Sequence, residues 1–128
     1  MRSEKAYTMN EILIVIIVIS VLISIALPRY ASTVERMRSA EGVQTLTALL
    51  QAEKMYFVDN NTYTSDISTL DVEIPTSNLF SAPEILEADN DNLLVSVRRN
   101  DPANAYYLEI DENGVMTCRG DSCLQLGY

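Results

Sequence analysis

The chain has 128 residues, 48% of them hydrophobic, and a formal net charge of −9. Nine basic residues are outnumbered by eighteen acidic ones, so nucleic acid is not expected as a main partner, because phosphate binding needs clustered lysine and arginine. Histidine, the commonest general base and the commonest zinc ligand, is absent from the sequence. We therefore expect no enzyme activity, no catalytic residue, no metal site and no cofactor.

An apolar run dominates the amino-terminal part of the chain. The sixteen residues from Ile12 to Leu27 contain no charge, and only Ser20 and Ser24 are polar. Counted from Tyr7 the segment has twenty-one residues, about 30 Å as a helix, which matches the hydrocarbon core of a bilayer. The run therefore predicts a membrane-spanning helix, with the lipid bilayer as a partner.

Three interpretations of this run compete: a secretory signal peptide, a plain membrane anchor, and a segment that serves first in the membrane and then in an assembly. Arg2 and Lys5 give a basic start, and small residues at 24–26 suit a signal peptidase. Glu11 argues against the first two, because a charge deep in a bilayer costs about 3 kcal/mol. No basic side chain lies within one helical turn of Glu11.

A cleavage between Ala6 and Tyr7 would supply a partner for Glu11. The new α-amino group would be charged at neutral pH and would lie at the level of the carboxylate. Within one chain the amino terminus of the helix favours that carboxylate. Between staggered copies, the amine of one chain would neutralise the acid of the next, which favours the assembly interpretation.

The residues KA-YTMNE, the apolar run after them and ALPRY resemble the amino-terminal segment of type IV pilins and of the related pseudopilins of type II secretion. The resemblance implies that a prepilin peptidase cuts after Ala6 and that Tyr7 becomes the methylated amino terminus. It also implies that Glu11 guides filament assembly and that Pro28 kinks the helix. Ala6 and Tyr7 replace the glycine and phenylalanine that the family prefers.

The resemblance implies a structural subunit of a type IV pilus-like filament that serves motility, adhesion or DNA uptake. A pseudopilin of a type II secretion system is the alternative, and a membrane-anchored binding domain or small enzyme is a third possibility. The partners implied are copies of the chain and other pilins, the prepilin peptidase and methylase, and the assembly platform of the bacterial inner membrane. The filament would be an extracellular pilus or a periplasmic pseudopilus.

Two cysteines, Cys118 and Cys123, are separated by four residues. An even number of cysteines close together favours a disulfide and an oxidising compartment, although two free thiols remain an alternative. Basic residues occur on both sides of the apolar run, so charge alone does not set the topology. The expected disulfide places the carboxyl-terminal part outside the cytoplasm, and the resemblance implies that the chain crosses the bacterial inner membrane once.

Three segments are expected: a leader at 1–6, a transmembrane and filament-core helix at 7–28, and an amphipathic helix with a globular β domain at 29–128. Residues 29–57 contain one glycine, no proline and many good helix formers. Their apolar positions step by threes and fours but drift around the helix, so no single face is apolar. Residues 58–92 contain turn residues and predict a connecting loop with one short strand or helical turn.

The last third of the chain predicts an antiparallel meander of three or four strands. The runs LLVSVRR, AYYLEID and VMTC are rich in β-forming residues, and Asn113-Gly114 is a strong hairpin signal. A turn at 99–104 that contains Pro102 precedes the second run. We expect an α+β, pilin-like fold in which a long kinked amino-terminal helix, membrane-spanning in its first half, packs on this small sheet.

Three further motifs have weak functional readings. Asp89-Asn90-Asp91-Asn92 offers oxygen ligands for calcium, but the spacing matches no complete site and a solvated turn is the better interpretation. Arg119-Gly120-Asp121 is an integrin-type tripeptide whose residues also suit a turn. Glu109 and Asp111 are candidate catalytic carboxylates on one face of a predicted strand, where simple solvation is expected.

Overall fold

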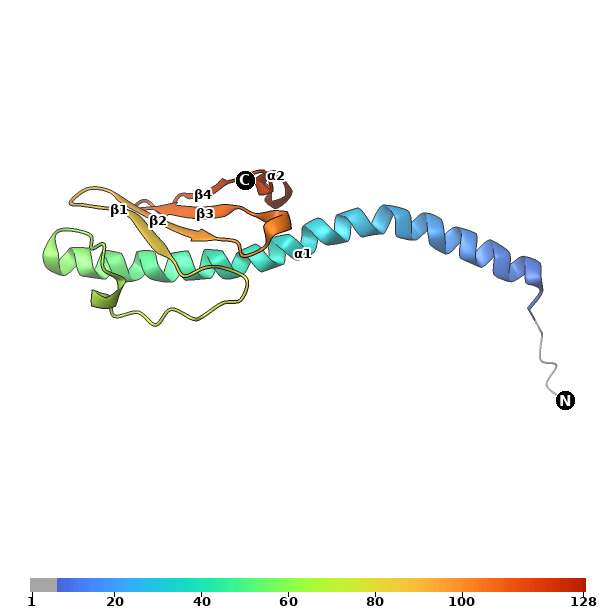
Figure 1. Ribbon diagram of the computed structural model, residues 1–128, viewed down its shortest axis with the longest axis horizontal. Helices are drawn as coiled ribbons and strands as arrows, with labels where there is room; N and C mark the ends of the chain where they lie inside the picture. Colours follow the sequence, from blue (N-terminus) through green and yellow to red (C-terminus); the bar gives the residue numbers. More distant parts are fainter. Residues whose placement is uncertain (1–6) are drawn as a thin grey trace. The chain divides into compact units, whose positions relative to one another are not determined.

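The computed structural model describes residues 7–128. Contacts divide the chain into two compact units, one that ends at Val34 and one from Glu35 to Tyr128. Helix α1 (Met9–Asn60) contributes its first part to the first unit and its second part to the other (Figure 1). After α1 the second unit contains a 3₁₀ turn at Ile67–Thr69, strands β1 (Glu84–Ala88) and β2 (Leu93–Arg98), a 3₁₀ turn at Pro102–Asn104, strands β3 (Tyr107–Asp111) and β4 (Met116–Arg119), and the short helix α2 (Cys123–Leu126).

The four strands form one antiparallel sheet in the order β1-β2-β3-β4. Val95 pairs with Ile110, and Leu108 pairs with Cys118, so the apolar residues of neighbouring strands share one face. The register between β1 and β2 shifts between Ile85 and Glu87. The predicted meander is confirmed with four strands, and the first strand comes from the segment that was expected to be mostly loop.

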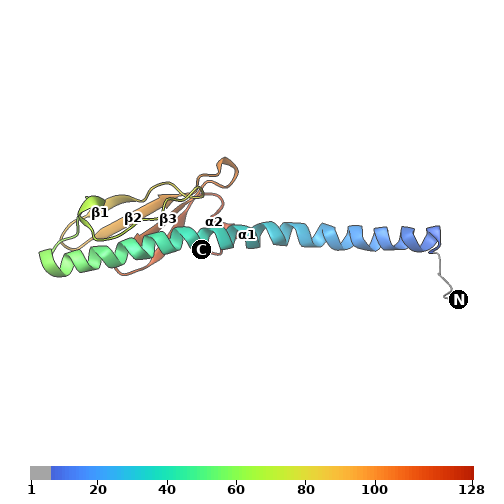
Figure 2. The same ribbon diagram turned by 90° about the horizontal axis from the view of Figure 1, so that it is seen from below.

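The second part of α1 lies along one face of the sheet in both views (Figures 1 and 2). Leu46, Leu49 and Leu50 of α1 are buried in one core with apolar residues of β2 and β3. The core members on these strands are Leu93, Val95, Val97, Leu108 and Ile110. This packing confirms the predicted α+β arrangement of a long helix on a small antiparallel sheet.

The buried face of α1 differs from the apolar positions that the sequence suggested. Met37 is one of the apolar residues of 29–57 that step by threes and fours, yet its side chain is 72% exposed. The residues that are buried step by threes and fours, and they include polar and small side chains as well as leucines. They are Glu35, Ser39, Gly42, Leu46, Leu49, Leu50 and Glu53.

Gly42 permits the close approach of α1 to the sheet. A Cβ atom at this position would lie 3.0 Å from Leu108 Cδ1 and 3.0 Å from two ring atoms of Phe80. Such distances are shorter than ordinary van der Waals contacts, so a larger residue would push the helix away from β3.

The turn between β3 and β4 forms where Asn113-Gly114 predicts it. Gly114 has a φ of +83°, a conformation that side chains disfavour. Asp111 Oδ1 accepts hydrogen bonds from the backbone N–H groups of Asn113 and Val115 at 3.0 and 2.7 Å. The turn therefore rests on one glycine and one carboxylate.

Candidate functional site

The apolar start of α1 is uncovered within its own unit. From Ile12 to Leu27 every large apolar side chain is between 46% and 62% exposed. Only the adjacent side chains of the same helix cover these residues. This is the one helix in the described part of the chain that is long and apolar enough to cross a membrane. A surface of this size needs lipid or another protein to cover it.

The two serines in this segment are satisfied by the helix itself. Ser20 Oγ donates to the carbonyls of Ile16 and Ile17 at 2.5 and 2.9 Å, and Ser24 Oγ donates to the carbonyl of Val21 at 2.7 Å. A hydroxyl that bonds back to its own helix leaves no unmet polar group. Both serines are therefore compatible with an apolar environment on every side.

Glu11 and Thr8 cap the start of α1 reciprocally. The backbone N–H of Thr8 donates to Glu11 Oε2 at 2.8 Å, and the Thr8 hydroxyl donates to the same oxygen at 3.1 Å. In return, the backbone N–H of Glu11 donates to Thr8 Oγ1 at 3.3 Å. This arrangement is a capping box, which satisfies donors that a helix amino terminus otherwise leaves free. The sequence signal T-x-x-E was present but was not used in the sequence analysis.

The capping box holds the carboxylate at the amino-terminal end of α1. Glu11 Oε1 makes no hydrogen bond to any residue in the part of the chain that the structure describes. Tyr7, directly before the capping threonine, is 80% exposed. The predicted cleavage site falls between Ala6, which lies outside the described residues, and Tyr7. Cleavage and methylation at this bond remain predictions.

Pro28 lies inside α1, which continues on both sides of it. A proline within a helix removes one backbone donor and crowds the preceding turn. The kink that the sequence predicts at this position remains a prediction.

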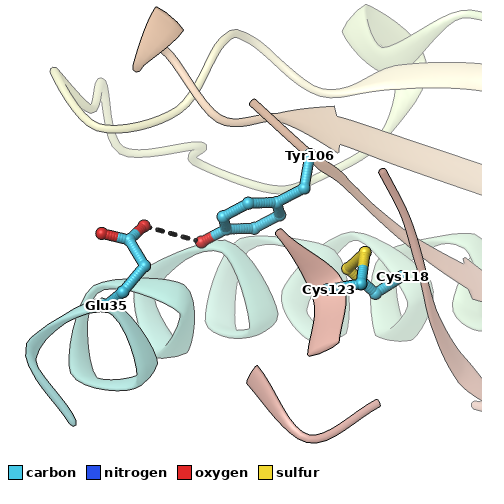
Figure 3. The surroundings of a disulfide bond; sticks show 4 residues. All are labelled: Glu35, Tyr106, Cys118 and Cys123. Carbon is cyan, nitrogen blue, oxygen red and sulfur yellow. Dashed lines mark hydrogen bonds between the residues drawn. A yellow bond between two sulfur atoms is a disulfide. The ribbon is translucent and has the colours of Figure 1, made fainter. Parts of the chain in front are cut away.

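In the second unit, a buried ion pair ties α1 to the sheet. Arg99 Nε donates to Glu35 Oε1 at 2.7 Å. The hydroxyl of Tyr106 donates to the same oxygen at 3.1 Å, and Figure 3 shows this second bond. The side chains of Glu35 and Arg99 are only 5% and 4% exposed. Arg99 also donates from Nη1 to the carbonyl of Leu79 at 2.8 Å. The sequence analysis missed this cluster.

The pKa values in the cluster follow its geometry. Burial pushes the pKa of Glu35 upward, but the hydrogen bonds from Arg99 and Tyr106 and the positive charge of Arg99 outweigh it, so the pKa is lowered. Burial and the nearby carboxylate raise the pKa of Tyr106, which therefore remains a hydroxyl donor. Glu35 thus stays ionised in a place from which water is excluded.

The two cysteines form the expected disulfide. Cys118 of β4 is bonded to Cys123 at the start of α2 (Figure 3). Cys123 and Leu126 are buried against the core, and Arg36 Nε donates to the carbonyl of Gln125 at 3.0 Å. The bridge therefore helps to hold the last residues of the chain against α1.

The Arg119-Gly120-Asp121 sequence lies in the ring that this disulfide closes. Arg119 is turned back onto the sheet, because its Nη2 atom is 2.9 Å from Glu109 Oε1 and its guanidinium lies 5.0 Å from the centre of the Tyr107 ring. Glu109 is thus an ion-pair partner, and Asp111 holds the hairpin turn. The two candidate catalytic carboxylates have structural roles.

The Asp89 turn is also closed by its own residues. Asp89 Oδ1 accepts the backbone N–H groups of Asp91 and Asn92 at 2.8 and 2.7 Å. The side-chain amide of Asn92 donates to both Asp89 oxygens at 3.2 Å. Asp89 therefore caps the turn between β1 and β2, as the solvated-turn interpretation expects.

Comparison with known proteins gives a consistent set of relatives. No protein-family model matches the chain. It is 33% identical over 70 residues to the type IV wide pilus major component PilA4 of Thermus thermophilus, an alignment covering 55% of this chain and 53% of that protein. It is 32% identical over 85 residues to the type II secretion system core protein G of Aeromonas hydrophila, covering 65% of this chain and 57% of that protein.

A third relative, the type II secretion system core protein G of Escherichia coli K12, is 33% identical over 75 residues, covering 57% of this chain and 52% of that protein. The chain thus spans about half the length of the curated relatives it matches. The relatives, the apolar start of α1 and the helix-on-sheet fold agree with one another. The chain is therefore similar in sequence to type IV pilins and to type II secretion pseudopilins, and these relatives support the resemblance that its amino-terminal segment shows.

Proposed function

We propose that the chain is a structural subunit of a type IV pilus-like filament that serves motility, adhesion or DNA uptake. It is made as an inner-membrane precursor, cut between Ala6 and Tyr7, and methylated at Tyr7. The observation that supports this proposal is the uncovered apolar surface of α1, which begins directly after a capped glutamate, Glu11. A catalytic function is not part of the proposal.

The apolar surface makes the exchange of lipid for other subunits possible. Each large apolar side chain gains roughly 1.5 to 3 kcal/mol when it is removed from water. Lipid and a filament core both provide this gain, so the apolar residues supply little net preference between the two. Selectivity for the filament must therefore come from polar groups.

Glu11 is the polar group that provides the preference. After cleavage, the positively charged amine of Tyr7 would lie one residue before Thr8, at the same end of the helix as the carboxylate. An amine from a neighbouring copy would pair with Glu11 Oε1, the oxygen that the capping box leaves open. In an apolar surrounding such a pair is much stronger than in water.

Thr8 stabilises the carboxylate of Glu11 before a neighbouring subunit binds. Its N–H and hydroxyl share Glu11 Oε2 at 2.8 and 3.1 Å, so the carboxylate is partly satisfied before a neighbour arrives. The same contacts keep it at the helix end rather than along the apolar surface. Thr8 thus positions Glu11 for the neighbour's amine.

The partners that this proposal requires are copies of the chain and other pilins, the prepilin peptidase and methylase, the inner-membrane assembly platform and the lipid bilayer. The precursor would cross the inner membrane once, through residues 7–28, with residues 29–128 outside the cytoplasm. The Cys118–Cys123 disulfide supports this orientation, because such bonds persist in oxidising compartments. Contacts that repeat without closing generate a fibre from a single kind of interface.

A pseudopilin of a type II secretion system is the second candidate. It is favoured by the relatives from Aeromonas hydrophila and Escherichia coli, both of which are type II secretion system core protein G. Deleting the gene in its host separates the two candidates. Loss of sheared surface filaments with normal protein secretion supports the pilus, whereas loss of secretion with no change in surface filaments supports the pseudopilus.

Replacing Glu11 tests the proposed assembly step. We expect Glu11→Ala and Glu11→Gln to insert into the membrane normally but to reduce incorporation into filaments at least tenfold, because both remove the charge that pairs with the amine. Asp59→Asn, which removes an exposed carboxylate at the far end of α1, is the matched control and should assemble normally. Normal incorporation of Glu11→Gln would contradict the proposed pairing.

A further inference from the structure

Glu53 is a second glutamate on the buried face of α1. It follows Glu35 by eighteen residues, about five helical turns, so the two side chains point to the same side of the helix. Glu53 is 0% exposed. Its Oε2 atom accepts the backbone N–H of Thr64 at 3.1 Å, whereas Oε1 has no hydrogen-bond partner among the residues that the structure describes.

The surroundings of Glu53 contain no compensating positive charge. None of the ion pairs in the described chain includes Glu53, and Lys54, its neighbour in sequence, is exposed. Tyr63, in the loop after α1, is close enough for the charge of Glu53 to act on it, and Glu112, in the turn after β3, acts on the same phenol. Tyr63 has a raised pKa because of its burial and the charges of Glu112 and Glu53, so it remains a neutral phenol.

This environment favours the protonated form of Glu53. An ionised carboxylate that is removed from water and lacks a cation is strongly disfavoured. Burial accordingly raises the pKa of Glu53, and the hydrogen bond from Thr64 opposes this only in part. The pKa of Glu35, which is also buried, is lowered instead, because the guanidinium of Arg99 supplies a positive charge next to it.

The hydrogen bond of Glu53 is one of the few contacts that fix the loop after α1. The loop is also held by the Phe57 and Tyr63 rings, whose centres are 4.7 Å apart, and by the bond from the Tyr63 N–H to the Asp89 carbonyl at 3.1 Å. The contact at Thr64 joins the loop directly to the core face of α1. Charging Glu53 would bring water to this contact.

We propose that Glu53 is a pH-sensitive latch, which holds residues 61–66 against α1 while its carboxyl group is protonated and releases them when it ionises. The proton resides on Oε1, so Oε2 remains free to accept the Thr64 N–H. The inference concerns the fold of residues 35–128 and is independent of the filament proposal. It adds a conformational response to the pH of the solution around this domain.

The direction of the effect follows from proton linkage. In the opened loop, Glu53 would titrate near the ordinary value of 4.5, whereas in the closed loop its pKa is higher. The closed state therefore binds the proton more tightly, and its advantage is complete below about pH 4.5. As the pH rises from there to the pKa of the closed state, the opening equilibrium increases by up to tenfold per pH unit.

Hydrogen exchange on the full chain in detergent micelles tests the latch. The measured quantity is the protection factor of residues 61–66 between pH 4.5 and pH 7.5, corrected for the intrinsic pH dependence of exchange. We expect it to fall as the pH rises through this range in the wild type. In Glu53→Gln, whose amide oxygen still accepts the Thr64 N–H but does not titrate, the factor should stay constant. Asp59→Asn should behave as the wild type.

Each outcome decides the proposal. A constant protection factor in the wild type would overturn it, and so would a fall of equal size in Glu53→Gln. If Glu53→Gln does not fold, carbon NMR of the wild-type carboxyl groups decides instead. A midpoint for Glu53 well above 4.5 supports the latch, and a midpoint near 4.5 overturns it.

Discussion

Arg99 Nε lies 2.7 Å from Glu35 Oε1, and this buried contact joins the first turn of α1 in the second unit to the end of β2. The hydroxyl of Tyr106 donates to the same carboxylate oxygen, and Arg99 Nη1 donates to the carbonyl of Leu79. Helix, strand and the segment before β1 are therefore held at one point. The cluster specifies which turn of α1 packs at this end of the sheet.

Removing one member of the pair is expected to destabilise the second unit. Glu35→Ala or Arg99→Ala leaves a buried charge without a partner, which costs about 3 kcal/mol. The free energy of unfolding from urea titrations, followed by circular dichroism, measures the loss. The double variant Glu35→Ala with Arg99→Ala should be less destabilised than the sum of the two single changes. Additive losses would show that the pair contributes no coupling.

The same pair predicts a loss of stability in acid. The pKa of Glu35 is lowered in the fold, so its stabilisation is present above about pH 4.5, the ordinary value, and is lost as the pH falls through the lowered pKa. The free energy of unfolding is measured from pH 6 to pH 2.5 in a Glu53→Gln background. This background removes the titration of Glu53, whose protonation at low pH would stabilise the fold and mask the loss from Glu35. The acid loss should shrink when Glu35→Gln is added.

Part of the acid loss should survive that change. Asp66, Asp89 and Asp101 also have lowered pKa values, because hydrogen bonds from neighbouring backbone and side-chain groups favour their charged forms. An acid loss that is identical with and without Glu35→Gln would contradict the role given to the ion pair.

The disulfide is expected to stabilise the carboxyl-terminal segment modestly. Closing so short a loop contributes about 2 kcal/mol in the chain-entropy model. The double variant Cys118→Ala with Cys123→Ala should lose about this amount, and a reducing agent should lower the wild type to a similar level. Hydrogen exchange should increase first in residues 119–128. An unchanged free energy of unfolding in the double variant would contradict this account.

Thr8 is expected to affect filament yield through its hydroxyl. Thr8→Val keeps the shape of the side chain but loses the cap, worth about 1 kcal/mol, and one of the two bonds to Glu11. Thr8→Ser keeps both functions. The ratio of sheared filament subunits to the membrane pool should fall several-fold in Thr8→Val and remain near the wild-type value in Thr8→Ser. Equal ratios in the two variants would remove Thr8 from the mechanism.

Local signals in the sequence predict most of the fold. Strands β2, β3 and β4 follow from runs of β-forming residues, and Asn113-Gly114 marks the turn between β3 and β4. Strand β1 is harder to recognise, because its sequence EILEA contains two acidic residues and its pairing with β2 is interrupted by a register shift. The short helix α2 was not predicted, since four residues carry almost no periodic signal.

The buried charges could not be predicted from hydrophobic periodicity. That method places charged residues such as Glu35 and Glu53 on the exposed face, whereas both lie on the face that packs against the sheet. The partner of Glu35 is sixty-four residues away in sequence, and only the fold brings the two together. The capping of Glu11 by Thr8 is local, so the T-x-x-E spacing alone would have predicted it.

The intact mass of the polypeptide in filaments sheared from its host tests the central proposal most directly. The proposal predicts a subunit that begins at Tyr7, lacks residues 1–6 and carries one additional methyl group. A polypeptide that retains Met1, or one that is never found in sheared or periplasmic polymers, would contradict it.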